Sequence, residues 1–197
     1  MTRAASRSRA TKETSIEVTL ELDGSGLTDV STGIPFYDHM LDQLARHSGF
    51  DLRVQAIGDL HIDTHHTVED VAITVGEAFR EALGDKRGIR RFASGRFPLD
   101  EALIDIALDL SGRAHVDWHV PMPESLPLGN PAFDPQLTEH AITSFANAAA
   151  MTLHVELVRG RNVHHIIEAT FKGLARSLRD AVRVDGPATV PSTKGTL

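Results

Sequence analysis

The sequence contains no cysteine and few aromatic residues, with one tryptophan and one tyrosine among 197 residues. Without cysteine the chain can form neither a disulfide nor a thiolate metal site, so histidine and carboxylate groups remain as metal ligands. It also lacks the apolar run of ~18 residues that predicts a membrane span. Its net charge of −7 argues against a nucleic-acid-binding protein, which would need a basic face. These absences favour a cytoplasmic location.

Two further absences concern nucleotides and targeting. Neither a Walker phosphate loop nor a GxGxxG phrase occurs. The first twelve residues carry four basic side chains and no acidic one, and they lack the apolar stretch of a secretory signal. We therefore predict a flexible basic tail over residues 1–12, with a transit or anion-binding role as the alternative.

Histidine, by contrast, is abundant, with 11 copies. The phrase HHxxE occurs at 65–69 and again at 164–168, 99 residues later. A single copy would most simply be the solvated start of a helix. Two copies, each followed by a helical stripe of apolar residues, predict a duplicated metal site. First-row metal ions prefer imidazole and carboxylate ligands of this kind.

The HHxxE phrases belong to a longer repeat of four elements. Each half begins with a strand of alternating apolar and polar residues, at 13–23 and at 101–111. An acid–histidine pair then opens a helix, a short strand follows, and the HHxxE helix ends the half. The first strands are 88 residues apart and the acid–histidine pairs 101 apart, because the loops differ in length. This self-similarity predicts an internal duplication.

We predict an α+β or α/β two-layer fold made of two fused half-domains, each a β-sheet with two helices. The first half-domain is expected over residues 13–99 and the second over 100–184. The proline-rich segment 121–135 is predicted to be a loop insertion. Residues 185–197 are predicted to be a mobile C-terminal tail.

The periodicity of a helix constrains how each HHxxE phrase can bind metal. His65 and Glu69 share a helix face, whereas His65 and His66 differ by about 100° of rotation. The two histidines of each pair are therefore expected to point at two different ions. Four ligands would leave a six-coordinate ion two open positions for water or substrate, and a set of imidazole and carboxylate ligands favours Mn, Fe, Co or Zn over Mg or Ca. The eight candidate ligands are His39, His65, His66, Glu69, His140, His164, His165 and Glu168.

Other polar residues lie close to these candidates in the sequence. Asp38, Glu139 and Asp70 either orient ligand imidazoles or are solvated acids at helix starts. Gln43 and His47 follow His39 on one helix face, as part of the site or of a polar surface stripe. The remaining histidines have no counterpart in the repeat, and we expect structural or surface roles for them: His61, His115, His119 and His154.

Basic residues gather in short polar phrases that are candidates for an anion site. Lys172 lies one helical turn after Glu168, where a cation would attract an anionic substrate group. A solvated charged loop is the alternative for each phrase taken alone. The C-terminal tail carries Ser192 and Lys194 and could close over the site.

Six phrases together resemble imidazoleglycerol-phosphate dehydratase of histidine biosynthesis. The resemblance covers nearly the whole chain from about Glu13 to Gly195, and the combination is highly specific. No phosphatase domain accompanies it, so the chain resembles the monofunctional form. The phrases are PFYDHML (35–41), DTHHTVED (63–70), DKRGIRRF (85–92), DLSGR (109–113), HHIIEA (164–169) and PSTKG (191–195).

The resemblance implies more than the spacing can show. It implies half-domains of the ribosomal protein S5 domain 2-like fold, each a four-stranded sheet with two helices. It implies a trimer-based 24-mer with active sites shared between subunits, and two Mn²⁺ ions per site held by the eight candidate ligands. Glu13 matches an acid/base position, and Gln43 and His47 match positions that contact substrate. The phosphate contacts would be Arg91, Arg113, Lys172, Ser192 and Lys194.

The implied reaction is the dehydration of D-erythro-imidazole-glycerol phosphate to imidazole-acetol phosphate. We expect a metal-bound imidazolate and a diazafulvene-like intermediate, from which a base such as Glu13 removes a proton, with Glu69 or Glu168 as further acid/base candidates. A metal-buffering scaffold is one competing hypothesis, and it would close all coordination positions. A ferritin-like di-iron oxidase is another, disfavoured by the strand patterns and by six histidines to two glutamates.

Overall fold

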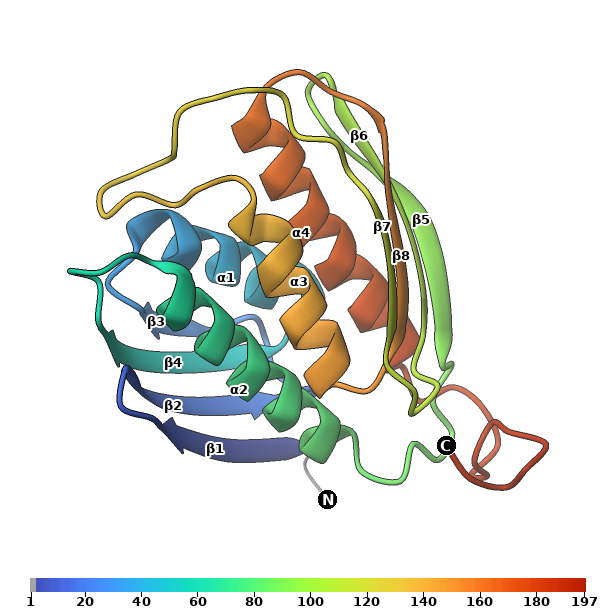
Figure 1. Ribbon diagram of the computed structural model, residues 1–197. Helices are drawn as coiled ribbons and strands as arrows, with labels where there is room; N and C mark the ends of the chain where they lie inside the picture. The colour runs from blue at the N-terminus through green and yellow to red at the C-terminus, as the bar shows by residue number, and fades with distance from the viewer. Residues whose placement is uncertain (1–2) are drawn as a thin grey trace.

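The computed structural model describes residues 3–197, which form two sheets and four helices (Figure 1). The first half contains β1 (Ala4–Ala10), β2 (Thr14–Glu21), β3 (Thr28–Ser31), α1 (Pro35–Ser48), β4 (Asp51–Gly58) and α2 (His65–Leu83). The second half contains β5 (Phe92–Leu99), β6 (Ala102–Asp109), β7 (His115–His119), α3 (Leu137–Ala148), β8 (Thr152–Arg159) and α4 (Val163–Ala181).

The two sheets have the same topology, which confirms the predicted duplication. Their strand orders are β1-β2-β4-β3 and β5-β6-β8-β7. In each sheet the last pair, β3 with β4 or β7 with β8, is parallel and the other pairs are antiparallel. An α+β protein with two sheet-plus-two-helix half-domains is therefore present, as the sequence predicted.

The predicted flexible tail over residues 1–12 is wrong for most of its length. Residues 4–10 form the edge strand β1, which pairs with β2 in the register Ala4↔Glu21; residues 1 and 2 lie outside the described range. Only Ala5 of this strand is buried, and the sequence AASRSRA lacks the alternation of large apolar and polar residues that predicts a strand. Charged side chains on an edge strand are a common protection against unwanted pairing.

The boundary between the half-domains also differs from the prediction. Strand β5 (Phe92–Leu99) pairs with β6, so it belongs to the second sheet and not to the first half. It is the counterpart of β1. Strand β1 begins 10 residues before β2, and β5 begins 10 residues before β6. The half-domains therefore meet in the loop between α2 and β5, and not at residue 99.

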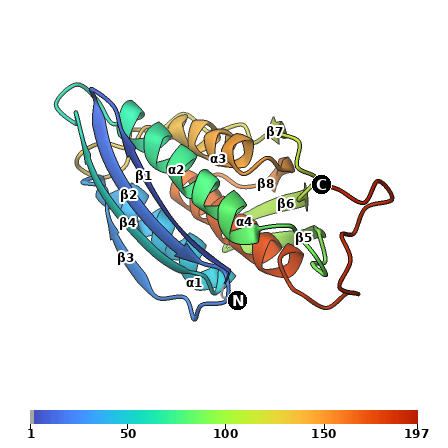
Figure 2. The same ribbon diagram turned by 90° about the horizontal axis from the view of Figure 1, so that it is seen from below.

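The sheets form the outer layers and the helices lie between them (Figure 2). Helix α2 packs on β1 and β2, and α4 packs on β5 and β6. The alternating residues Ile16, Val18 and Leu20 of β2 turn their apolar side chains to the helices. Across the centre, α1 contacts α4 and α2 contacts α3. Helices from different halves therefore lie side by side in the middle of the molecule.

The predicted loop insertion contains no helix or strand between 121 and 135, but a buried aromatic residue anchors it. Phe133 is fully buried, and its ring lies 5.3 Å from that of Phe36 and 6.0 Å from that of Tyr37. An isolated bridge joins Phe133 to Leu128. The loop is therefore held against the start of α1. Among the described residues, no helix is long and apolar enough to cross a membrane.

Candidate metal centre

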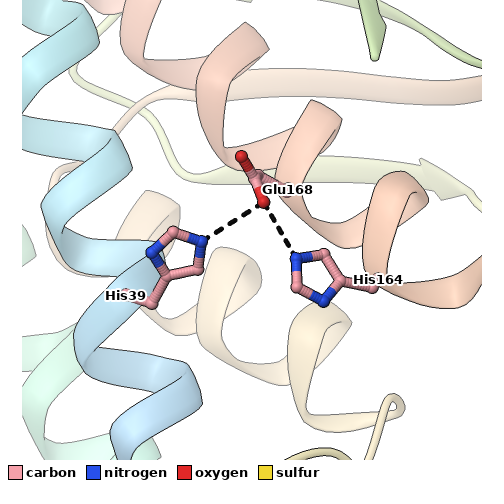
Figure 3. A group of neighbouring side chains, drawn as sticks. All are labelled: His39, His164 and Glu168. Carbon is pink, nitrogen blue, oxygen red and sulfur yellow. Dashed lines mark hydrogen bonds and ion pairs between the residues drawn. The ribbon is translucent and has the colours of Figure 1, made fainter. Parts of the chain in front are cut away.

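The first candidate site lies where α1 meets α4 (Figure 3). The Glu168 Oε2 atom is 3.3 Å from His39 Nε2 and 3.0 Å from His164 Nε2. One ligand atom from each of these residues lies within 4.8 Å of the others. Glu168 is buried, while both rings are partly exposed. We call this group the α1/α4 cluster.

The second candidate site lies where α2 meets α3. His140 Nε2 is 3.1 Å from Glu69 Oε1, and the rings of His65 and His140 are 4.3 Å apart. The three residues again bring ligand atoms within 4.8 Å of one another. We call this group the α2/α3 cluster.

Residues at equivalent positions of the two halves lie in different clusters. His39 corresponds to His140, and the HxxxE portion of the first phrase corresponds to that of the second. Each cluster takes its single histidine from one half and its HxxxE pair from the other. Neither half-domain contains a complete cluster, because the acid–histidine helix of each half packs against the HHxxE helix of the other.

The second histidine of each pair belongs to neither cluster. The rings of His65 and His66 are 6.1 Å apart and nearly perpendicular, and those of His164 and His165 are 6.2 Å apart. His66 Nδ1 lies 3.0 Å from Asp59 Oδ2. His165 Nδ1 lies 2.7 Å from Glu101 Oε2. Adjacent histidines therefore face different groups, which is the divergence that helix rotation predicts.

Glu168 is held in its charged form by neighbouring donors. Burial alone would raise its pKa, but hydrogen bonds from Lys172 and His164 outweigh burial and lower the pKa to about 2. Lys172 Nζ lies 2.6 Å from Glu168 Oε1. The cation predicted beside the metal ligands is therefore in contact with one of them.

Gln43 and His47 extend from the α1/α4 cluster along α1. Gln43 Nε2 lies 3.5 Å from His39 Nδ1. Burial lowers the pKa of His47, and the nearby charges of Lys172 and Arg176 lower it further. This face of α1 thus meets the basic side of α4, and it is not a uniformly solvated stripe.

Of the three acids expected either to orient ligand imidazoles or to be solvated, Asp38 and Asp70 have other partners. Asp38 Oδ1 accepts hydrogen bonds from the backbone and hydroxyl of Thr32. Asp70 accepts from Arg9 and from Thr14, and so attaches β1 and β2 to α2. Glu139 lines an open pocket of about 920 Å³ beside the α2/α3 cluster, with the 121–135 loop as its far wall.

Asp59 and Glu101, the carboxylates that contact His66 and His165, were not among the residues predicted from the sequence. Glu101 had a usable signal, since it stands 88 residues after Glu13 in the repeat. Asp59 had none, because it lies in the loop between β4 and α2 and its position depends on the chain path. The hydrogen bond from His165 and the backbone N–H of Asn162 lower the pKa of Glu101 to about 2.

Glu13 lies near the outward-facing histidine of the first half. Its Oε2 atom is 3.8 Å from His66 Nδ1, and its side chain is 52% exposed. With Asp59 and His66 it forms a third group of potential ligands within 4.8 Å. Since Asp59 already occupies the near side of the ring, Glu13 is free to contact a bound molecule.

Four of the predicted phosphate contacts gather in a second pocket, apart from both clusters. The C-terminal segment folds back beside the end of β6 and encloses about 770 Å³ with Arg91, Arg113, Ser192 and Lys194 among its walls. Arg91 is engaged already, because it donates to both oxygens of Asp109 and to the carbonyl of Pro191. Lys172 is not part of this pocket.

The donor set of the two clusters fits divalent first-row metal ions. Each cluster offers two imidazole nitrogens and one carboxylate. The Nε2 atom of His140 is buried and has no hydrogen-bond partner, although Glu69 lies close to it. A buried polar atom without a partner is costly, and an ion between the imidazole and the carboxylate would satisfy both.

Comparison with known proteins assigns the family. Residues 32–178 match the model of the family described as imidazoleglycerol-phosphate dehydratase. The enzyme of that name from Acidothermus cellulolyticus is 55% identical over 195 residues, which cover 99% of this chain and 93% of that protein. The chloroplastic enzyme of pea, Pisum sativum, is 53% identical over 198 residues, covering 100% of this chain and 69% of the pea protein.

Solved structures agree with this assignment. The imidazoleglycerol-phosphate dehydratase of Staphylococcus aureus superimposes with a TM-score of 0.81 at 31% identity, covering 94% of this chain and 99% of that one. The Pyrococcus furiosus structure gives a TM-score of 0.79 at 35% identity, covering 97% and 100%.

The duplicated fold and the matched sequence identify an enzyme of the hydro-lyase class, which removes water from its substrate. More narrowly, the chain belongs to the imidazoleglycerol-phosphate dehydratase family of histidine biosynthesis. The resemblance drawn from the six sequence phrases is confirmed.

Proposed function

We propose that this chain catalyses the metal-dependent dehydration of D-erythro-imidazole-glycerol phosphate to imidazole-acetol phosphate. Family membership supplies the reaction class, and the pair of histidine–glutamate clusters is the observation that carries the metal dependence. Each cluster brings three ligand atoms within 4.8 Å. Three protein ligands leave coordination positions for one more ligand and for substrate, as in catalytic sites.

The cofactor that we propose is two Mn²⁺ ions per active site, with other divalent first-row ions as alternatives. Six of the eight predicted ligands lie in the two clusters. The other two, His66 and His165, are partly exposed and face away from the clusters of their own chain. A second copy of the chain could therefore supply the fourth ligand of each ion. This supports active sites shared between copies, and we propose the trimer-based 24-mer that the family resemblance implies as the assembly that shares them.

The two clusters would hold the ions through His39, His164 and Glu168 and through His65, Glu69 and His140, and ions there would favour the deprotonated form of the substrate's imidazole ring. The chain must then supply a group that accepts the proton from carbon. We assign that role to Glu13, whose exposed carboxylate is not engaged in a short contact. Glu69 and Glu168 are the second candidates for this role. They rank below Glu13 because their carboxylates already contact histidines and would be occupied by metal binding. The intermediate expected from the sequence stays a prediction.

The phosphate of the substrate would be bound by basic and hydroxyl groups. Lys172 stands beside the α1/α4 cluster, and Gln43 and His47 lie on the same side of it. The C-terminal pocket is lined by Arg113, Ser192 and Lys194. Arg91 lines it too, but its charge is paired with that of Asp109. We propose that these two groups meet around substrate in the assembled enzyme, with the tail closing over it.

Removing the metal tests this proposal. Protein stripped with a chelator should lose dehydratase activity on imidazoleglycerol phosphate, and activity should return as Mn²⁺ is added back. Mg²⁺ at the same concentration is the matched control, because all-oxygen sites suit it better than imidazole does. Metal-free protein that dehydrates substrate at the full rate would refute the metal dependence and leave the family assignment in place.

A further inference from the structure

We propose that Asp59 and Glu101 are positioning residues that fix the tautomer and the ring orientation of His66 and His165. Each carboxylate would hold a proton on Nδ1 of its histidine, so that the free electron pair is on Nε2 and points outward to a metal ion. This inference rests on the proposed metal centre, and it adds the residues that prepare its two outward-facing ligands.

Glu101 is itself fixed on two sides. One carboxylate oxygen, Oε2, lies 2.7 Å from His165 Nδ1. The other, Oε1, accepts hydrogen bonds from the backbone N–H groups of Asn162 at 2.8 Å and Arg161 at 3.3 Å. These two residues form the turn that leads into α4. The glutamate therefore ties the ring of His165 to the start of its own helix, and the ring has little freedom to rotate.

Asp59 is fixed by burial. Its side chain is 10% exposed, and its Oδ2 atom lies 3.0 Å from His66 Nδ1. The other oxygen, Oδ1, is buried and has no hydrogen-bond partner. Because a buried carboxylate with an unsatisfied oxygen is costly, the contact with His66 is the interaction that compensates for its position.

The chemistry of the ring decides what these contacts do. An ionised carboxylate accepts hydrogen bonds and cannot donate one, so Nδ1 of each ring must carry the proton. In a neutral imidazole the other nitrogen, Nε2, then holds the free electron pair. Histidines that bind metal generally donate their second nitrogen to such a carboxylate, which fixes the ring and makes it a better ligand.

The internal repeat shows why the two halves use different carboxylates. Glu13 and Glu101 occupy equivalent positions, 88 residues apart. In the second half Glu101 contacts the histidine at 2.7 Å, whereas in the first half Glu13 stays 3.8 Å away because Asp59 occupies that place. The second half has no counterpart of Asp59. The 99-residue offset of the HHxxE phrases leads to Val158, and the 101-residue offset of the acid–histidine pairs leads to Gly160. Asp59 thus leaves Glu13 free for the reaction.

The test is a titration of metal-free protein with Mn²⁺, in competition with a coloured chelator, that resolves the two binding steps. Glu101→Ala and Asp59→Ala should each weaken one of the two steps by about 10- to 100-fold and leave the other unchanged. Glu101→Gln keeps an oxygen that can accept the bond, so it should lose less affinity than Glu101→Ala. A purely structural role would weaken both steps together.

Two controls separate this inference from the proposed function. Asp29→Asn changes a 65% exposed carboxylate on β3 whose partners are Arg53 and Gln55, and it should leave both steps within about twofold. Glu13→Gln should bind metal normally and lose turnover. If wild-type protein binds no Mn²⁺, the proposed metal centre fails. If it binds two ions and the Ala variants bind them equally well, only the positioning role is overturned.

Discussion

Glu168 and Glu69 occupy equivalent positions in the repeat but differ in their surroundings. Glu168 is buried and contacts Lys172, whereas the side chain of Glu69 is 38% exposed. The residue equivalent to Lys172 in the first half is Ile73, so Glu69 lacks a neighbouring lysine at that position. A repeat preserves the residue that the chemistry needs, while its neighbours diverge. The two clusters are therefore similar as ligand sets and different in charge.

Removing either glutamate should remove one ion. Glu168→Gln is expected to lower the bound metal from two ions per chain to one by emptying the α1/α4 cluster, and Glu69→Gln should do the same at the α2/α3 cluster. The double variant should bind none. Metal analysis after gel filtration measures this, with the exposed Glu156 of β8 changed to Gln as the control. A Glu168→Gln protein that retains both ions would exclude Glu168 as a ligand.

Asp51 gives a dependence of stability on pH. Hydrogen bonds from the backbone N–H groups of Leu27 and Ser25 lower its pKa in the folded protein. Its contribution is therefore present above the pKa of the unfolded chain and is lost as the pH falls through the lower, folded value. Asp51→Ala should destabilise the protein by about 1 kcal/mol at pH 7.

The measurement for Asp51 is urea unfolding of both proteins from pH 7 down into the acid range. The difference between them should shrink as the wild-type carboxylate becomes protonated. A difference that stays constant with pH would show that the charged carboxylate is not the stabilising group.

At the scale of elements, β1 shows how a strand can form without an apolar pattern. Its side chains are mostly exposed, and it is held by backbone pairing with β2 and by Arg9, which donates to Asp70 on α2 at 2.7 Å. The sequence of this segment therefore shows a basic charge but no pattern that predicts a strand. The helices and the strands β2 and β6 were predictable, because their apolar residues follow a local period.

Asp70 tests the attachment of β1. Asp70→Ala would leave Arg9 and the hydroxyl of Thr14 without their acceptor, and we expect a loss of about 2–3 kcal/mol in the free energy of unfolding. Denaturant titration measures this. Glu81→Ala removes an exposed partner of Arg7 and should change stability by less than about 1 kcal/mol. Because Asp70 contacts no imidazole, the variant should keep its metal affinity, and a selective loss of one ion would contradict this placement.

At the scale of the whole molecule, the clusters explain why the chain is duplicated. Each cluster needs one helix from each half, so a single half-domain provides a lone histidine and an HxxxE pair that cannot meet. If His66 and His165 complete the metal sites of neighbouring copies, as we propose, an isolated chain carries the parts of two sites and completes neither.

The assembly should appear in solution as a particle of 24 chains, about 514 kDa from 24 × 21.4 kDa. Light scattering or mass photometry measures this mass. If active sites are shared, an inactive His165→Ala protein and an inactive His39→Ala protein should regain part of the activity when they are dissociated and reassembled together. Each variant reassembled alone is the control. Full activity in a monomeric fraction would contradict shared sites.

The sequence by itself determined the duplication, the period of each helix and most strands, and the divergence of adjacent histidines. All of these depend on residues close together in the chain, where spacing fixes direction. Only the tertiary structure decided that His39 joins Glu168 of the other half, that residues 4–10 form a strand, and that Asp59 and Glu101 face the outward histidines. These contacts arise from packing between distant segments, and no local pattern encodes them.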